Sequence, residues 1–203
     1  METKGNDVLH TLVGCPSKIF SVLGKTLYTA KTLKLHNVDA EKCRDLLDPM
    51  LAQLHAWDAT QSFYPDGNLE WPLLAEAYKH TAILRILRLP DKYSIPCSDD
   101  RIRACVNAIL DTSAQVSRDS PYFKRFLFPL FVAGAETESP HQQQYVALCI
   151  DSIRDTTGFR YKSLYELLQK TWAERKTSNG AVNVPWFDFV RSNSVNALHC
   201  PAH

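Results

Sequence analysis

Apolar residues recur every three or four positions along most of this chain of 203 residues, which is the period of an amphipathic helix. No segment alternates apolar and polar residues between hairpin turns, as a half-buried strand would. A polar and aromatic loop is expected at 59–68. The expected helices cover residues 15–30, 39–54, 71–89, 98–116, 122–135, 139–157, 164–172 and 185–190. The pattern predicts an all-α fold, with a single domain of about eight packed helices.

The expected helix over residues 139–157 has the most complete start and stop signals in the sequence. Ser139 is suited to the N-cap and Pro140 to the first helical position, while Gln142 is spaced to reach back in a capping box. Gly158 supplies the left-handed residue that ends many helices. These signals predict a short connection after the apolar segment 122–135.

The adjacent acids Asp99 and Asp100 follow Ser98 at another expected helix start. Paired carboxylates hold magnesium in some helical bundles, but neighbouring helical residues point about 100° apart, so a metal site would need further acids on facing helices. A cap at Ser98 with two carboxylates at the positive end of the helix dipole explains all three residues. We therefore expect no metal there.

The chain carries 23 basic and 22 acidic residues, a formal net charge of +1. This balance gives no overall field to attract phosphate backbones or acidic membranes, so direct nucleic-acid binding is not expected. No apolar run approaches the roughly 20 residues that cross a bilayer, and the first residues lack the apolar core of a signal peptide. We expect a soluble nuclear or cytoplasmic protein.

The cysteines are spread over the chain without a CxxC pair. They stand at Cys15, Cys43, Cys97, Cys105, Cys149 and Cys200. Most fall on apolar helical faces, where cysteine behaves as a small hydrophobic residue, so we expect reduced and mostly buried thiols. His199, Cys200 and His203 could bind a stray transition metal, but we interpret them as a non-functional terminus. No cofactor or metal is predicted.

Glu136 is the acidic residue most in need of a partner, because it directly follows the apolar run 127–135. Arg85, Arg125 and Arg154 are the candidate partners. One interpretation is a structural ion pair at a helix end, and the other is a polar anchor inside a ligand pocket. The sequence leaves both open.

The common enzyme motifs HExxH, GxSxG, GxxxxGKS and GxGxxG are absent from the sequence. His55 and His80 are best interpreted as packing or helix-end residues. If the chain were an enzyme, its candidate catalytic residues would be Tyr78, His80 and Glu136.

Several segments, taken in order, resemble one known family. They are Gly14-Cys15-Pro16, the segment 74–84, the segment 128–136, Gly158-Phe159, Trp172 and Trp186. This ordered set is similar to the fungal-specific transcription factor domain, the C-terminal regulatory region of zinc-cluster transcription factors of the acriflavine-sensitivity type. The resemblance covers residues 10–195, which leaves tails at 1–9 and 196–203.

The resemblance implies a regulatory helical domain in transcription, which acts through a protein partner, through homo- or heterodimerisation, or by sensing a small apolar ligand. The family's six-cysteine zinc cluster has no counterpart in these scattered cysteines, so its DNA-reading activity is not carried over. The alternative is a cofactor-independent cyclase or isomerase of fungal secondary metabolism, using a shaped apolar pocket. A purely structural scaffold is the third interpretation.

Overall fold

The computed structural model describes residues 14–36, 40–62, 64, 68–89, 93, 95–159, 162–177 and 183–190, and all regular structure within these ranges is helical. The helices are α2 (Ser17–His36), α3 (Ala40–Ala56), α4 (Glu70–Leu87), α5 (Asp100–Ala114), α6 (Leu127–Glu136), α7 (Pro140–Thr157) and α8 (Lys162–Thr177). Two 3₁₀ turns, η1 (Ala59–Gln61) and η2 (Phe123–Phe126), and a short helix at 186–190 complete them. The predicted all-α single domain is confirmed.

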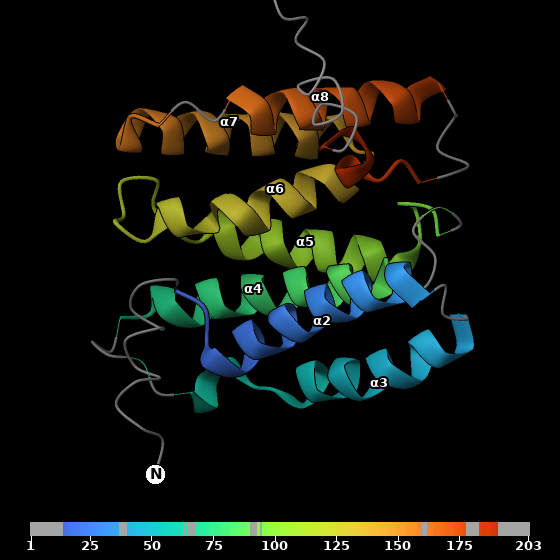
Figure 1. Ribbon diagram of the computed structural model, residues 1–203. Helices are drawn as coiled ribbons and strands as arrows, with labels where there is room; N and C mark the ends of the chain where they lie inside the picture. Colours follow the sequence, from blue (N-terminus) through green and yellow to red (C-terminus); the bar gives the residue numbers. More distant parts are fainter. Residues whose placement is uncertain are drawn as a thin grey trace, which may run out of the picture.

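The helices lie side by side in a stacked array (Figure 1). From α4 to α7 each helix packs against the next one in sequence, so α4 contacts α5, α5 contacts α6, and α6 contacts α7. At the other end of the array, α2 and α3 pack against each other and against α4. Helix α8 returns to contact α6.

Helices α4 and α6 form the centre of the domain. Every residue of α6 from Pro129 to Glu136 is buried, as expected for a helix that is apolar on all sides. Gly134 allows α7 to approach closely, because a Cβ atom there would lie 2.8 Å from Val146 Cγ1. The fully buried Phe123, Phe126 and Leu130 join the same core. The apolar segment therefore marks the interior, although its first residues form η2 rather than a continuous α-helix.

The predicted N-cap at Ser98 and the predicted capping box at Ser139 are wrong, although Ser139 is the N-cap residue of α7. Asp99, not Ser98, caps α5, and its carboxylate accepts the Arg101 backbone N–H at 2.9 Å. The capping box at α7 does not form, because Ser139 makes no side-chain cap bond. Gln142 instead donates to Asn107 Oδ1 at 2.8 Å and accepts from the Thr137 hydroxyl. Tertiary partners thus replace the local bond that the sequence suggested.

The other signals of this region are confirmed. Pro140 is at the start of α7, and Gly158 ends it with a φ of 71° while its N–H donates to Arg154 O at 2.8 Å. Residue 39, where the second helix is expected to start, and the domain limits near residues 10 and 195 fall outside the described residues.

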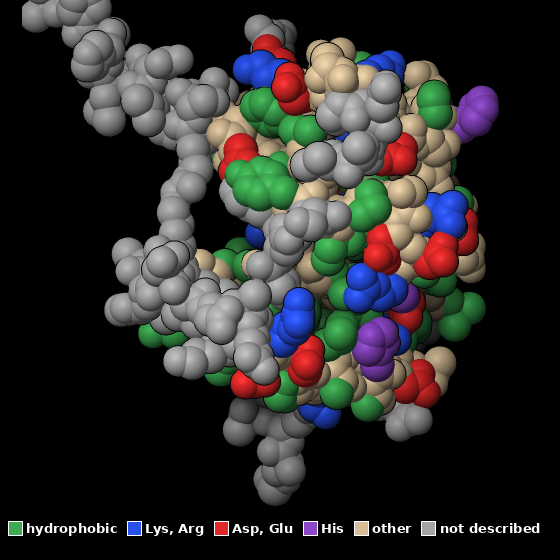
Figure 2. Space-filling model, turned by 90° about the vertical axis from the view of Figure 1, so that its right-hand side faces the viewer, with side chains coloured by type: hydrophobic (Ala, Val, Ile, Leu, Met, Phe, Trp, Pro, Cys, Tyr) green, Lys and Arg blue, Asp and Glu red, His purple; other side chains and the backbone are tan. Residues whose placement is uncertain are grey.

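Acidic and basic side chains are interspersed on the face of the molecule shown in Figure 2, in line with the near-zero net charge. Among the described residues, no helix is both long enough and apolar enough to cross a membrane.

Candidate functional site

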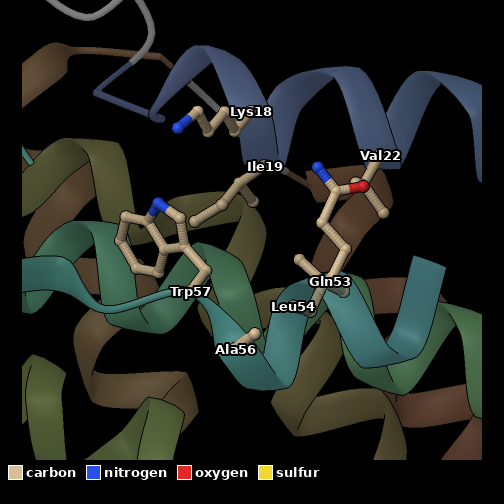
Figure 3. Close-up of a pocket in the computed structure, with 7 residues that line it drawn as sticks. All are labelled: Lys18, Ile19, Val22, Gln53, Leu54, Ala56 and Trp57. Atoms are coloured by element: carbon tan, nitrogen blue, oxygen red, sulfur yellow. The ribbon is translucent and has the colours of Figure 1, made fainter. Parts of the chain in front are cut away.

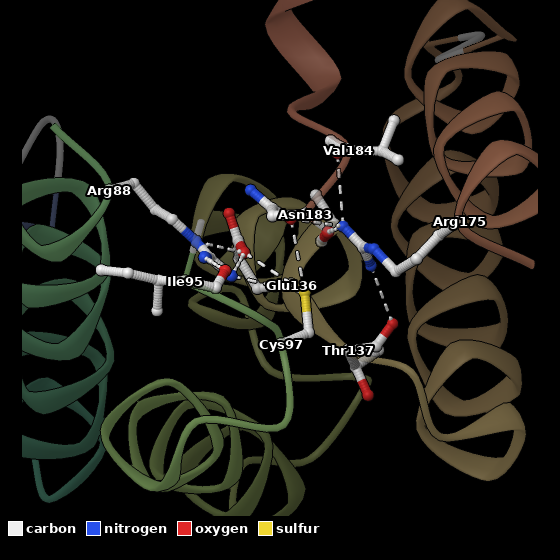
Figure 4. A network of polar contacts seen from close by, with 9 residues as sticks. Arg88, Ile95, Cys97, Glu136, Thr137, Arg175, Asn183 and Val184 are labelled. Atoms are coloured by element: carbon white, nitrogen blue, oxygen red, sulfur yellow. Dashed lines mark hydrogen bonds and ion pairs between the residues drawn. The ribbon is translucent and has the colours of Figure 1, made fainter. Parts of the chain in front are cut away.

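A buried ion pair joins the ends of two central helices (Figure 4). Arg88 follows α4, Glu136 ends α6, and their side chains are only 3% and 6% exposed. Arg88 Nε and Nη2 both donate to Glu136 Oε2, at 2.8 and 2.6 Å. Arg88 Nη1 also donates to the Ile95 carbonyl oxygen. Desolvating two charges is costly, and these additional bonds are what make the burial tolerable.

A second buried arginine extends this arrangement. Arg175 of α8 donates to Asn183 Oδ1 at 3.1 Å, and the Cys97 thiol donates to the same oxygen at 3.5 Å. Cys97 also accepts from Arg88 Nη2 at 3.3 Å. We call Arg88, Cys97, Glu136, Arg175 and Asn183 the polar cluster. It connects α4, α6, α8 and the segment 183–190 (Figure 4).

Side chains of α8 donate hydrogen bonds to the carbonyl oxygens at the carboxyl end of α6. Arg175 donates to the carbonyl oxygens of Ala135 and Thr137 at 2.7 and 3.3 Å, and the Trp172 indole donates to Gly134 O at 2.8 Å. The last carbonyls of a helix have no partner within it, and a cation there also interacts well with the helix dipole. Side chains of α8 therefore cap α6.

The geometry of the polar cluster fits a structural role. The Glu136 carboxylate is engaged by Arg88, so the predicted partners Arg85, Arg125 and Arg154 are wrong. Arg154 pairs on the surface with Asp151 and Asp155, at 2.7 and 3.0 Å. Burial, with a smaller contribution from the Glu136 charge, raises the pKa of Cys97 to about 12. The thiol is thus protonated at neutral pH and is a poor nucleophile.

The structure does not bring the three candidate catalytic residues together. Tyr78 and His80 are two positions apart on α4, so they point about 200° apart around the helix. The Tyr78 hydroxyl donates to the Arg125 carbonyl oxygen at 3.3 Å, and burial raises its pKa. Glu136 lies in the polar cluster. The described residues therefore offer no support for the enzymatic alternative.

His80 belongs to a different polar group on α4. Its Nε2 atom is 3.2 Å from Glu76 Oε1, which also accepts from Lys79 Nζ at 3.0 Å. Burial raises the pKa of Glu76, but the hydrogen bonds from His80 and Lys79 outweigh it and leave that pKa lowered. Lys79 also donates to the Trp57 carbonyl oxygen at 3.3 Å. The group ties α4 to the end of α3.

A pocket of about 300 Å³ opens between α2, α4 and α6. Its lining is Phe20, Leu23, Gly24, Thr26, Leu27, Tyr78, Arg85 and Phe128, and we call it the apolar pocket. Thr26 donates its hydroxyl to Val22 O at 2.8 Å, and the Tyr78 hydroxyl is bonded to Arg125. Both hydroxyls therefore already have a partner within the protein. Arg85 is the one charged side chain of this lining. The volume is at the lower end of the range for small-molecule sites.

A second pocket, of about 260 Å³, lies between α2 and the end of α3 (Figure 3). Lys18 and Gln53 flank it, and the Trp57 ring faces it from the α3 side. Its lining thus includes polar side chains beside the buried core residues Ile19, Val22 and Leu54. It fits a small apolar molecule less well than the apolar pocket does.

The cysteine prediction holds for the described part of the chain. Cys15, Cys43, Cys97, Cys105 and Cys149 are buried and free, and Cys200 lies outside the described residues with the histidines near it. Asp99 and Asp100 each pair with an arginine, Arg101 and Arg103. Within the described ranges, no group of three or more His, Cys, Asp or Glu side chains is placed to hold a metal ion.

Sequence reasoning identified Glu136 but missed most of its surroundings. Arg88, Cys97, Arg175 and Asn183 come from four separate segments, and no local pattern links them. Arg85 carried a usable signal, because it lies seven residues after Tyr78 and so on the same face of α4. That spacing predicts that the two side chains face the same part of the structure, and both line the apolar pocket.

These features define a helical domain with a polar cluster at the ends of its central helices and an apolar pocket between α2, α4 and α6. The family model of the fungal specific transcription factor domain matches residues 1–200. The chain belongs to this family, as the resemblance indicated, and the family assigns it a role in transcriptional regulation. No curated protein and no solved structure gives a significant match.

Proposed function

We propose that this chain is a ligand-sensing regulatory domain that binds a small apolar molecule in the apolar pocket and acts in the nucleus. The observation that carries the proposal is the lining of that pocket, in which the hydroxyls of Thr26 and Tyr78 are already bonded to the protein. Because these hydroxyls already donate to the protein, an apolar molecule can displace water from the pocket without leaving them unpaired.

The position of the pocket supports a regulatory role. Its walls come from three helices, with α2 on one side and Phe128 at the start of α6 on another. A ligand that contacts both walls favours the arrangement in which they are close, and so shifts the population toward it. The size of that shift is limited by the difference in ligand affinity between the two arrangements.

Binding of the neutral fluorescent probe N-phenyl-1-naphthylamine tests the proposal. Gly24 faces the pocket, and a Cβ atom there would meet nothing within 4 Å, so Gly24→Leu fills the space without a backbone clash. We expect probe binding to the unmodified chain and loss of most of it in Gly24→Leu. Lys25→Leu adds the same side chain at an exposed position of α2 and is the control. No binding to the unmodified chain, or equal binding to both variants, would refute the proposal.

Exposed apolar side chains at the edge of the pocket favour a second candidate function, which is association with a partner helix or a second copy of the chain. Phe20 and Leu27 are 42% and 59% exposed, and with Gly24 they follow one face of α2. Such a stripe suits helix-in-groove binding. Light scattering over a range of concentrations would detect self-association, and Leu27→Glu should abolish it. A monomer at all concentrations would rule out the dimer and leave a different protein as the partner.

A further inference from the structure

Arg85 is the charged group of the apolar pocket, and its surroundings differ from those of Arg88, which directly follows α4. The Arg85 guanidinium is 5.6 Å from the ring centre of Trp186 and 5.5 Å from that of Phe187. Within the described part of the chain it makes neither a hydrogen bond nor an ion pair. Arg88, three residues later, has a carboxylate, a carbonyl oxygen and a thiol as partners.

This environment leaves the Arg85 donors available to a ligand. A guanidinium carries five N–H donors in a planar fork, and stacking on aromatic rings uses none of them. Arg85 is also partly exposed, whereas Arg88 is buried. Burial lowers the pKa of Arg85, and the nearby Glu136 charge offsets this only in part. A bound anion beside the guanidinium would further stabilise its charged form and so offset the cost of burying it.

We propose that the apolar pocket binds an amphipathic acid, a small molecule whose hydrocarbon body lies against Phe20 and Leu27 and whose carboxylate pairs with Arg85. The proposal rests on the ligand-binding function proposed above and adds the chemical class of the ligand. A carboxylate suits the guanidinium fork because it accepts two parallel N–H bonds. One cation matches a singly charged head group, since the rest of the lining offers no second cation for a phosphate.

The test compares ligands that share one hydrocarbon chain. Dodecanoate, 1-dodecanol and methyl dodecanoate would each be titrated against the bound N-phenyl-1-naphthylamine probe, below their aggregation concentrations and at pH 7.5. We expect dodecanoate to displace the probe at a concentration about tenfold lower than the alcohol or the ester, as a charge-assisted pair would give. Equal displacement by all three would overturn the carboxylate proposal and leave the apolar site intact. Failure of the probe itself to bind would instead refute the proposed function.

Two variants then locate the carboxylate contact. Arg85→Met keeps a long apolar stem beside Trp186 and removes the charge, so it should bind the alcohol as before and lose the preference for dodecanoate. Arg154→Met removes an exposed arginine of α7 and should retain that preference. A preference that survives in folded Arg85→Met would overturn the role of Arg85. If Arg85→Met does not fold, the comparison of acid with ester in the unmodified chain still decides whether the site selects a carboxylate.

Discussion

Arg88 and Glu136 are 48 residues apart in sequence, and the side-chain atoms Nη2 and Oε2 are 2.6 Å apart in the interior. Such a pair contributes less to stability than its short distance suggests, because both ions have lost their water. Removing one member strongly destabilises the fold, because the other charge then remains buried without a partner. The pair therefore constrains both helices more strongly than either residue would alone.

Glu136→Gln should lower the free energy of unfolding by about 3 to 5 kcal/mol, because Arg88 then lacks its carboxylate. Urea unfolding followed by circular dichroism measures the change. Glu138→Gln removes an exposed carboxylate two residues away and should change stability by about 0.5 kcal/mol or less. Replacing both members, with Arg88→Met added, should cost less than the sum of the single changes. Equal effects of the two glutamine variants would contradict this account.

Gly134→Ala should destabilise the domain by about 1 to 3 kcal/mol, because the new methyl group would lie 2.8 Å from Val146 Cγ1. Adding Val146→Ala should relieve the clash, so the double variant loses less than the two single variants combined. Gly24→Ala is the matched control, since a Cβ there meets nothing within 4 Å and alanine favours helix by up to about 1 kcal/mol. Thermal melts of the four variants would give the comparison, and a stabilising Gly134→Ala would disprove the close approach.

Asp99→Ala should cost about 1 kcal/mol at pH 7, because the Arg101 backbone N–H loses its acceptor. Asp111→Ala, at an exposed position of the same helix, is the control.

The effect of Asp99→Ala should depend on pH in one direction. The hydrogen bond from the Arg101 side chain, together with the backbone bond, lowers the pKa of Asp99 from 3.8 to about 2. A carboxylate with a lowered folded-state pKa stabilises above its unfolded pKa, and this stabilisation is lost as pH falls through the folded value. The difference in stability between the unmodified chain and Asp99→Ala should therefore shrink between about pH 4 and pH 2. A difference that grows with acidity would show that Asp99 is not held as a carboxylate.

The buried thiols should resist alkylation in the native state. Burial raises the pKa values of Cys15 and Cys105 to about 12, and these two residues are 0% and 5% exposed. Iodoacetamide at pH 8 followed by peptide mass spectrometry should leave both unmodified until urea unfolds the chain. Ser163→Cys adds a thiol at an exposed position of α8 and should react within minutes under the same conditions. Rapid native labelling of Cys15 would contradict its burial.

The sequence was sufficient for the fold class because helical periodicity is a local property. The ends of α7 at Pro140 and Gly158 were predicted for the same reason, since each depends on the backbone preference of one residue. The capping box failed because it required Gln142 to choose between two polar partners, and the structure gives it Thr137 and Asn107 instead. Competition between local and tertiary hydrogen bonds is decided by packing, which the sequence pattern does not contain.

The site was predictable only in part for a related reason. An acid at the end of an apolar helix needs a cation, and this much followed from Glu136 alone. Choosing Arg88 over Arg85 required the relative rotation of α4 and α6. The same rotation directs Arg85 toward the apolar pocket. The structural arginine, Arg88, and the candidate ligand-binding arginine, Arg85, are thus only three positions apart in sequence.

The capping of α6 by Trp172 and Arg175 has a consequence for the order in which the chain is made. Translation produces α6 well before α8, so a nascent chain that has not yet reached these residues lacks the donors for the carbonyl oxygens of Gly134, Ala135 and Thr137. The buried helix α6 is thereby completed by residues of α8, which are synthesised after it. Folding of the interior is completed only after synthesis has passed residue 175.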